Sequence, residues 1–199
     1  MKKIILATSN QGKIKEFTQL LNHLPFEWTA QSELGIPDAP ETGLTFVENA
    51  IIKARNASKL SGLPALADDS GLVVNCLNGA PGVYSARYAG PNATRDDLIK
   101  KLLNEIQKSG SADRSAHYYC VLVLLQYPDD PAPLIAQGIW PGEILSAPKG
   151  DHGFGYDPVF FLRNHDCSVA ELLPAEKNRI SHRSLAIQEL KRQLQCNYS

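Results

Sequence analysis

The residues with the most evident chemical use lie near the N-terminus, in the segment TSNQGK at positions 8–13. An apolar run at 4–7 precedes it and apolar residues at helical spacing between 14 and 21 follow it, which predicts a buried strand, a turn and a helix. Such a turn directs unpaired backbone N–H groups and the positive end of the helix dipole outward, so it favours an anion. Gly12 allows close approach, and Lys13 adds a mobile positive charge. We therefore interpret the segment as a phosphate-binding turn.

Two better-known phosphate loops are excluded by spacing, because this strand is followed by neither G-x-x-x-x-G-K-[ST] nor G-x-G-x-x-G. A P-loop kinase and a Rossmann dehydrogenase are therefore disfavoured. The remaining alternative is a plain helix N-cap formed by Ser9 or Asn10, with Lys13 as a solvated residue of the first turn.

Two adjacent carboxylates, Asp68 and Asp69, stand in the segment ALADDSG at 65–71. A small apolar strand that ends here before a glycine turn would place them where α/β proteins keep their ligands. If strand geometry continues through both residues, their side chains point to opposite faces, so only one can serve a given site. We expect Asp69 to be the reacting group and Asp68 to orient the loop or a metal-associated water. The alternative is an ordinary Asp-Ser-Gly turn whose side chains bond their own backbone.

A third carboxylate, Glu41, precedes a predicted helix that contains Lys53. On that helix Lys53 shares a stripe with the apolar residues at positions 46, 50 and 57 instead of facing water. The lysine either snorkels to the surface or reaches an anionic ligand that the helix helps to enclose. Because Mg²⁺ prefers carboxylate and phosphate oxygens, Glu41 and Asp69 could supply the protein half of its coordination shell.

Two further groups of residues lie downstream. In the glycine-bracketed loop GFGYDP at 153–158, Phe154 could stack on a flat ring, and the alternative is a structural turn with Phe154 in the core. Between 177 and 183, cations cluster near the start of the last predicted helix. Cations there oppose the helix dipole, so we expect a bound anion or a protein acceptor beside them, although a solvated helix start is the alternative.

The pattern of apolar residues indicates an α/β fold with a mixed sheet. Helices are predicted at 12–22, 45–61, 95–108 and 183–195, with capping-box patterns at Thr45 and Thr94 and an N-cap at Ser181. Strands are predicted at 2–7, 26–30, 65–68, 72–76, 117–127, 134–140 and 158–162, the run 117–127 being central. At 199 residues, we expect one domain over 1–199.

The composition narrows the class of protein. Twenty Lys and Arg against 21 Asp and Glu give a net charge of −1, so no basic field would attract a nucleic-acid polymer. No apolar run approaches the ~18 residues of a membrane span, and the N-terminal run is too short for a signal peptide, so we expect a cytoplasmic protein without a membrane partner. The four cysteines form no C-x-x-C pair, which favours reduced structural thiols over a zinc or redox site.

Taken together, these motifs closely resemble the inosine triphosphate pyrophosphatase family, enzymes that hydrolyse non-standard purine nucleoside triphosphates. The resemblance covers nearly the whole chain. It is carried by six motifs in order: TSNQGK at 8–13, ETGLTFVENA at 41–50, ADDSGL at 67–72, GAPGVYSAR at 79–87, the segment 153–160, and SHR at 181–183.

The resemblance implies an elongated mixed sheet with flanking helices, two lobes around a nucleotide cleft, and a homodimer. It implies cleavage of ITP, dITP and XTP between the α- and β-phosphates, with Mg²⁺ held by Glu41 and Asp69. The implied catalytic residues are Asp69, Asp68, Lys13 and Lys53. The implied substrate-binding residues are Thr8, Ser9, Asn10, Gln11, Gly12, Lys13, Ser70, Phe154, Gly155, Tyr156, Asp157, Lys177, His182 and Arg183, with Phe154 stacked on the base and the last three around the purine 6-oxo edge.

Two other readings are open. A Maf-like nucleotide pyrophosphatase has a related fold, but it should lack the 153–160 loop and the SHR motif. A catalytically silent nucleotide-binding module would not need the full acidic set at 41, 68 and 69. How guanine is excluded does not follow from these residues, since it also has a 6-oxo group.

Overall fold

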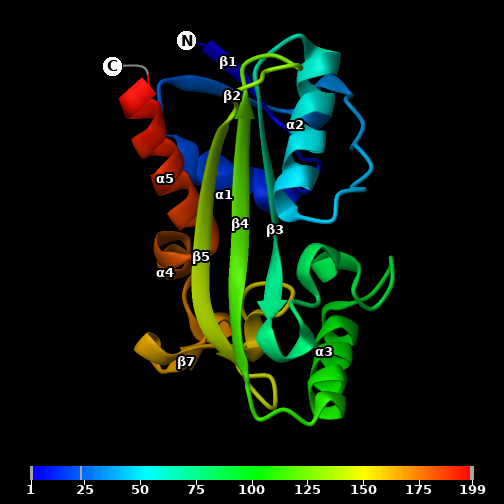
Figure 1. Ribbon diagram of the computed structural model, residues 1–199. Coiled ribbons are helices and arrows are strands. Elements are labelled where there is room, and N and C mark those ends of the chain that lie inside the picture. Colours follow the sequence, from blue (N-terminus) through cyan, green and yellow to red (C-terminus); the bar gives the residue numbers. More distant parts are fainter. Residues whose placement is uncertain (1, 23, 198–199) are drawn as a thin grey trace. The chain divides into compact units, whose positions relative to one another are not determined.

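The computed structural model describes residues 2–22 and 24–197, and helices and strands intermix along them (Figure 1). The helices of this part of the chain are α1 (Gln11–Leu21), α2 (Phe46–Ser61), α3 (Arg95–Ser109), α4 (Pro174–Ile180) and α5 (His182–Asn197). The strands are β1 (Lys2–Leu6), β2 (Phe26–Ala30), β3 (Ala65–Val74), β4 (Ser115–Leu125), β5 (Leu134–Ile144), β6 (Phe160–Leu162) and β7 (Cys167–Ser168).

The strands form a mixed sheet in the order β2-β1-β3-β4-β5-β6-β7. Strand β1 pairs in parallel with β2 and β3, whereas β6 pairs antiparallel with β5 and β7. The α/β class, the mixed sheet and the central position of the run 117–127, now β4, are confirmed. None of the helices in the described residues is long and apolar enough to cross a membrane.

The chain divides into two compact units. The first comprises residues 1–69, 120–138 and 183–199, and the second comprises 70–119 and 139–182, so β3, β4 and β5 each contribute to both. In the first unit, one face of the sheet is buried against the apolar sides of α1 and α5. The core of this unit includes Leu6, Leu66, Leu122, Phe17 and Ile187.

The second unit has its own apolar core. Buried apolar residues of helix α3 belong to the same core as residues of β3 and aromatic side chains of β4, β5 and β6. That core includes Leu102, Leu72, Tyr118, Trp140 and Phe160. Each unit therefore has a rigid apolar base on which polar side chains can be fixed.

The predicted elements agree with the structure in most places, with corrections in three. The four predicted helices are confirmed as α1, α2, α3 and α5, but α4 was missed because it spans only seven residues. The two strands predicted at 65–68 and 72–76 are one continuous strand, β3, because the polar stretch between them stays extended instead of turning. The segment predicted as a strand at 158–162 begins as a 3-10 turn, and the two-residue strand β7 was not predicted.

Local capping explains where the helices begin and end. Helix α2 starts at a capping box in which the Thr45 hydroxyl accepts from the Glu48 N–H and Glu48 accepts from the Thr45 N–H. It ends at Gly62, whose φ of 70° suits glycine. The four cysteines, all within the described residues, are free thiols, as predicted.

The second capping box gives a test of the local sequence signals. Thr94 accepts from the Asp97 N–H at 3.2 Å, and Asp97 accepts from the Thr94 N–H at 2.9 Å. We expect Thr94→Ala to lower the free energy of unfolding by about 1 kcal/mol, because it leaves orphan N–H groups at the start of α3. Thr94→Ser keeps the hydroxyl and should stay close to the wild type in urea denaturation; equal losses in both variants would contradict this account.

Candidate active site

The turn between β1 and α1 is built as the sequence indicates. The Thr8 hydroxyl accepts from the Asn10 N–H at 3.2 Å, and the Asn10 side chain accepts from the Lys13 N–H at 3.1 Å. Asn10 is therefore the N-cap of α1, which was one of the alternatives. The Ser9 hydroxyl donates to Asp38, a contact that the sequence did not suggest. The cap orders the turn and orients Lys13, and it is compatible with an anion at the helix start.

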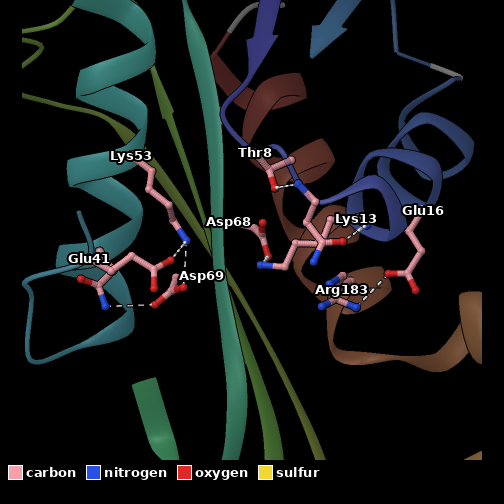
Figure 2. Close-up of polar contacts among 10 residues, drawn as sticks. Thr8, Lys13, Glu16, Glu41, Lys53, Asp68, Asp69 and Arg183 are labelled. Carbon is pink, nitrogen blue, oxygen red and sulfur yellow. Dashed lines mark hydrogen bonds and ion pairs between the residues drawn. The ribbon is translucent and has the colours of Figure 1, made fainter. Parts of the chain in front are cut away.

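Strand β3 carries both central carboxylates in its buried interior (Figure 2). Alternation along the strand puts Asp68 on the same face as Leu66, toward α1 and α5, and Asp69 on the opposite face, toward α2. The prediction that the two carboxylates point to opposite faces is confirmed. The prediction that the strand ends here before a glycine turn is wrong, because β3 continues to Val74. Asp68 and Asp69 are 3% and 6% exposed, so each carboxylate needs a hydrogen-bond or ion-pair partner within the protein.

On the first face, Asp68 pairs with Lys13, which lies in the first turn of α1. Lys13 Nζ lies 2.8 Å from Asp68 Oδ2. Burial alone would raise the pKa of Asp68, but the positive charges of Lys13, Lys53 and Arg183 together lower that pKa to about 2. Asp68 is therefore ionised at neutral pH.

On the second face, one ammonium group joins two carboxylates. Lys53 Nζ lies 2.8 Å from Glu41 Oε1 and 2.9 Å from Asp69 Oδ1 (Figure 2). Burial would lower the pKa of Lys53, but Asp68, Asp69 and Glu41 outweigh it and raise that pKa. Lys53 is thus a buried ion-pair residue and not a snorkelling one.

The two aspartates differ in their electrostatics. Burial raises the pKa of Asp69 above its usual value, and the charge and hydrogen bond of Lys53 only partly offset this effect. Adjacent carboxylates whose pKa values are pushed in opposite directions can take different roles. Asp69 is the more basic of the two.

Buried Arg183 and half-buried Glu16 form a further ion pair in the first unit. Arg183 Nη1 lies 2.8 Å from Glu16 Oε2, and Glu16 stands one turn after Lys13 on α1. The Arg183 residue is 4% exposed. The expected protein acceptor beside this cation is confirmed. Glu16 was missed, and its spacing from Lys13 was the signal that could have found it.

Helix α2 holds another polar residue that sequence analysis did not single out. Asn49 is fully buried, donates to Asp69 Oδ2 at 3.3 Å and accepts from the Gly43 N–H at 2.8 Å. Its place in the apolar stripe of the helix, one turn before Lys53, was the only sequence signal.

In the second unit, the loop at 153–157 is organised around the carboxylate of Asp157. This carboxylate accepts from the Phe154 N–H at 2.8 Å, from Tyr118 Oη at 3.2 Å and from Lys177 Nζ at 2.6 Å. Gly153 has a φ of 77°, and a Cβ there would lie 2.1 Å from Asp157 Oδ2. The glycine is needed because the carboxylate occupies that space. Lys177 belongs to α4 and not to the start of the last helix, and its expected protein acceptor is Asp157.

Flat surfaces lie next to this carboxylate in the second unit. The Lys177 ammonium lies 4.2 Å from the centroid of the Phe154 ring, and Phe154 is 49% exposed. His182 stacks on Tyr118 with ring centroids 4.8 Å apart and planes 10° apart. Tyr156 is buried and donates from its hydroxyl to the Ser85 carbonyl at 2.9 Å. Phe154 is therefore a half-exposed ring with a cation over it, and not a core residue.

The predicted site residues thus fall into two groups. One lies in the first unit: Thr8, Ser9, Asn10, Gln11, Gly12, Lys13, Glu41, Lys53, Asp68, Asp69 and Arg183. The other lies in the second unit: Ser70, Phe154, Gly155, Tyr156, Asp157, Lys177 and His182. In the first group, ion pairs join Lys13 to Asp68 and Lys53 to Asp69. In the second group, Asp157 accepts hydrogen bonds from Phe154 and Lys177.

The donor set of the first unit fits magnesium. Among the described residues, no cluster of three or more His, Cys, Asp or Glu side chains could hold a metal by itself. Glu41 and Asp69, however, converge on a single positive charge at Lys53 Nζ. Mg²⁺ is usually bound through one or two carboxylates together with substrate phosphates, so two converging carboxylates are compatible with its requirements.

Comparison with known proteins identifies the family. A model of the Ham1 family matches residues 4–193, and the chain belongs to this family. A dITP/XTP pyrophosphatase of Vibrio cholerae is 54% identical over 190 residues, which are 96% of this chain and 95% of that protein. One from Coxiella burnetii is 52% identical with the same coverage.

Solved structures agree with this assignment. The structure of a HAM1 protein from Coxiella burnetii matches with a TM-score of 0.94 and 51% identity, covering 98% of this chain and 99% of that one. The Ham1 protein of Staphylococcus aureus matches with a TM-score of 0.88 and 40% identity, at the same coverage. The family resemblance inferred from the motifs is confirmed.

The Lys13–Asp68 ion pair, in which the carboxylate is buried, leads us to expect that the stability of the fold depends on pH. The pKa of Asp68 in the folded protein, about 2, lies below the ordinary aspartate value of 3.8. The stabilisation of the fold by this carboxylate is therefore fully present above pH 3.8 and is lost as the pH falls toward 2. At neutral pH that shift corresponds to about 2 kcal/mol. We expect Asp68→Asn to lower the free energy of unfolding by at least this amount, with the difference shrinking below pH 4.

Urea denaturation between pH 7 and pH 3 measures the difference. Glu27→Gln removes an exposed carboxylate of the same unit and should change stability by less than about 0.5 kcal/mol at every pH. A difference between wild type and Asp68→Asn that is independent of pH would contradict the assigned electrostatics.

Proposed function

We propose that this protein hydrolyses dITP, XTP and ITP to the nucleoside monophosphate and pyrophosphate, and so removes non-standard purines from the nucleotide pool. The relatives named dITP/XTP pyrophosphatase support the reaction and its substrates. The observation that carries the proposal is the pair of carboxylates in β3, because each is buried beside a lysine on its own face of the strand.

The proposed reaction is attack of water on the α-phosphorus, with pyrophosphate as the leaving group. Asp69 accepts the proton of the water, since its raised pKa makes it the more basic carboxylate. Asp68 has a pKa of about 2 and is a poor base, so it holds Lys13 in place instead.

The triphosphate is held by positive charge and backbone N–H groups. Lys13, Lys53 and the backbone N–H groups of the turn at 8–12 are suited to this role, because they lie on the same unit as both aspartates. Fixed donors of this kind also stabilise the charge that develops on the departing pyrophosphate.

Glu41 and Asp69 are proposed to hold Mg²⁺. When bound, the cation supplies charge neutralisation at the phosphates and promotes ionisation of the attacking water. Glu41 and Asp69 meet the requirement for oxygen ligands, and Lys53 keeps the two carboxylates together in the protein described here.

The base is proposed to stack on Phe154, with Lys177, His182 and Arg183 near the purine 6-oxo edge. Donors at that edge match the oxo group of hypoxanthine and xanthine and face a mismatched amino group in adenine. Asp157 already accepts from three protein donors, so its proposed role is to hold Phe154 and Lys177. The proposal also includes a homodimer in the cytoplasm and no nucleic-acid polymer as partner.

The first test is product analysis with dITP, XTP, GTP and ATP, with and without Mg²⁺. We expect magnesium-dependent release of pyrophosphate from dITP and XTP, with kcat/KM on the order of 100-fold or more above that for ATP. Ion chromatography separates pyrophosphate from orthophosphate. Release of orthophosphate would place the cleaved bond elsewhere, and nucleotide binding without turnover would support a silent binding module.

A second test separates the two aspartates. Asp69→Asn should lower kcat by about 10² to 10⁴-fold, because the general base and one proposed ligand of the cation are lost together. Nucleotide affinity measured without Mg²⁺ should change little, because Lys13 and Lys53 remain. Steady-state kinetics and equilibrium binding measure the two effects. Asp129→Asn, an exposed carboxylate of the same unit, is the control. Near-normal turnover of Asp69→Asn would exclude it as the proton acceptor.

A further inference from the structure

Asn49 is a fully buried amide whose two ends contact two different parts of the site. A backbone N–H can only donate, so the atom facing Gly43 must be the side-chain oxygen, and the NH₂ group therefore faces Asp69. The contact distances are 2.8 Å to the Gly43 nitrogen and 3.3 Å to Asp69 Oδ2. Both ends of the amide are thus used, which offsets the cost of burying it.

These contacts leave Asp69 little freedom to rotate. Asn49 holds Oδ2, while Lys53 Nζ holds Oδ1 at 2.9 Å. Lys53 and Asn49 both come from α2, one turn apart, so a single helix sets the plane of the carboxylate.

The same residue fixes the loop that carries Glu41. Gly43 lies close to the start of α2, where a Cβ would be 2.6 Å from Glu48 Cβ and 2.9 Å from Asn49 Oδ1. The glycine therefore allows the loop to reach the amide, and Glu41 is two residues before this anchor. Glu41 then contacts Lys53 at 2.8 Å, so the loop is tied to α2 at both points.

We propose that Asn49 is a positioning residue that aligns the Asp69 carboxylate and the Glu41 loop on one cation. The inference rests on the proposed function, since it assigns the cation to Glu41 and Asp69. In this arrangement the Asn49 amide couples Glu41 and Asp69, so that neither carboxylate adopts its cation-binding position without the other. Residues that orient metal ligands typically change metal affinity or activity by about 10 to 100-fold when mutated.

The test is Asn49→Leu, which has similar volume and neither donor nor acceptor. We expect the dissociation constant for Mn²⁺, measured by electron paramagnetic resonance on the nucleotide-free protein, to rise about 10-fold or more. With dITP and saturating Mg²⁺, kcat should fall about 10 to 100-fold, while KM changes less than about threefold because the phosphate and base contacts are intact.

Asn56→Leu is the matched control. Asn56 is also on α2 and also holds the loop before the helix, through a 2.9 Å hydrogen bond to the Pro37 carbonyl, but no hydrogen bond links it to a carboxylate. Since no carboxylate of the described residues accepts a hydrogen bond from Asn56, this variant should bind Mn²⁺ as the wild type does. Gly43→Ala is a second variant, which disturbs the contact between the loop and the Asn49 side-chain oxygen. If Asn49→Leu does not fold, Gly43→Ala provides the test of the positioning role.

The outcomes separate this inference from the proposed function. Weaker Mn²⁺ binding in Asn49→Leu and Gly43→Ala, but not in Asn56→Leu, supports the positioning role even if the wild type does not hydrolyse dITP. Mn²⁺ affinity and kcat within twofold of the wild type in a folded Asn49→Leu would overturn it, and so would an equal loss in Asn56→Leu. The proposed function would stand in either case, provided that the wild type releases pyrophosphate.

Discussion

The site in the first unit depends on one constraint, which is that two adjacent carboxylates are buried in the interior of one strand. Alternation in β3 forces Asp68 and Asp69 to opposite faces, and burial requires a cation on each. The surrounding elements meet that requirement: α1 supplies Lys13 to one face, and α2 supplies Lys53 to the other. The turn at 8–13 and the Glu41 loop are thereby brought to the same strand by charge pairing as well as by packing.

Much of this arrangement could be predicted from the sequence, because its signals are local. The turn before α1 follows from an apolar run, small polar residues and helical spacing, and the odd place of Lys53 in an apolar stripe indicated a buried partner. The opposite orientation of the two aspartates follows from strand geometry alone. The family resemblance added the expected roles of the site residues. The match to the Ham1 family confirms the resemblance itself.

The rest depends on contacts between residues far apart in the chain. Asp157 accepts from Tyr118 and Lys177, which are 39 and 20 residues away, and Arg183 meets Glu16 across 167 residues. No local pattern encodes such pairs. Strand β3 was predicted as two strands for a related reason. The stretch Asp-Asp-Ser-Gly favours a turn locally, but in the sheet its two carboxylates form ion pairs with lysines of two helices.

The ion pairs of the first unit leave no unpaired positive charge among their members. The three cations Lys13, Lys53 and Arg183 face the four carboxylates Asp68, Asp69, Glu41 and Glu16, so this group has one carboxylate more than it has cations. Under the proposed function, a triphosphate that arrived alone would add negative charge to a group that already has an excess of carboxylates. Nucleotide and cation should therefore bind cooperatively, each increasing the affinity for the other by the same factor. This charge balance would make the protein a receptor for the magnesium complex of the nucleotide and a poor receptor for the free anion.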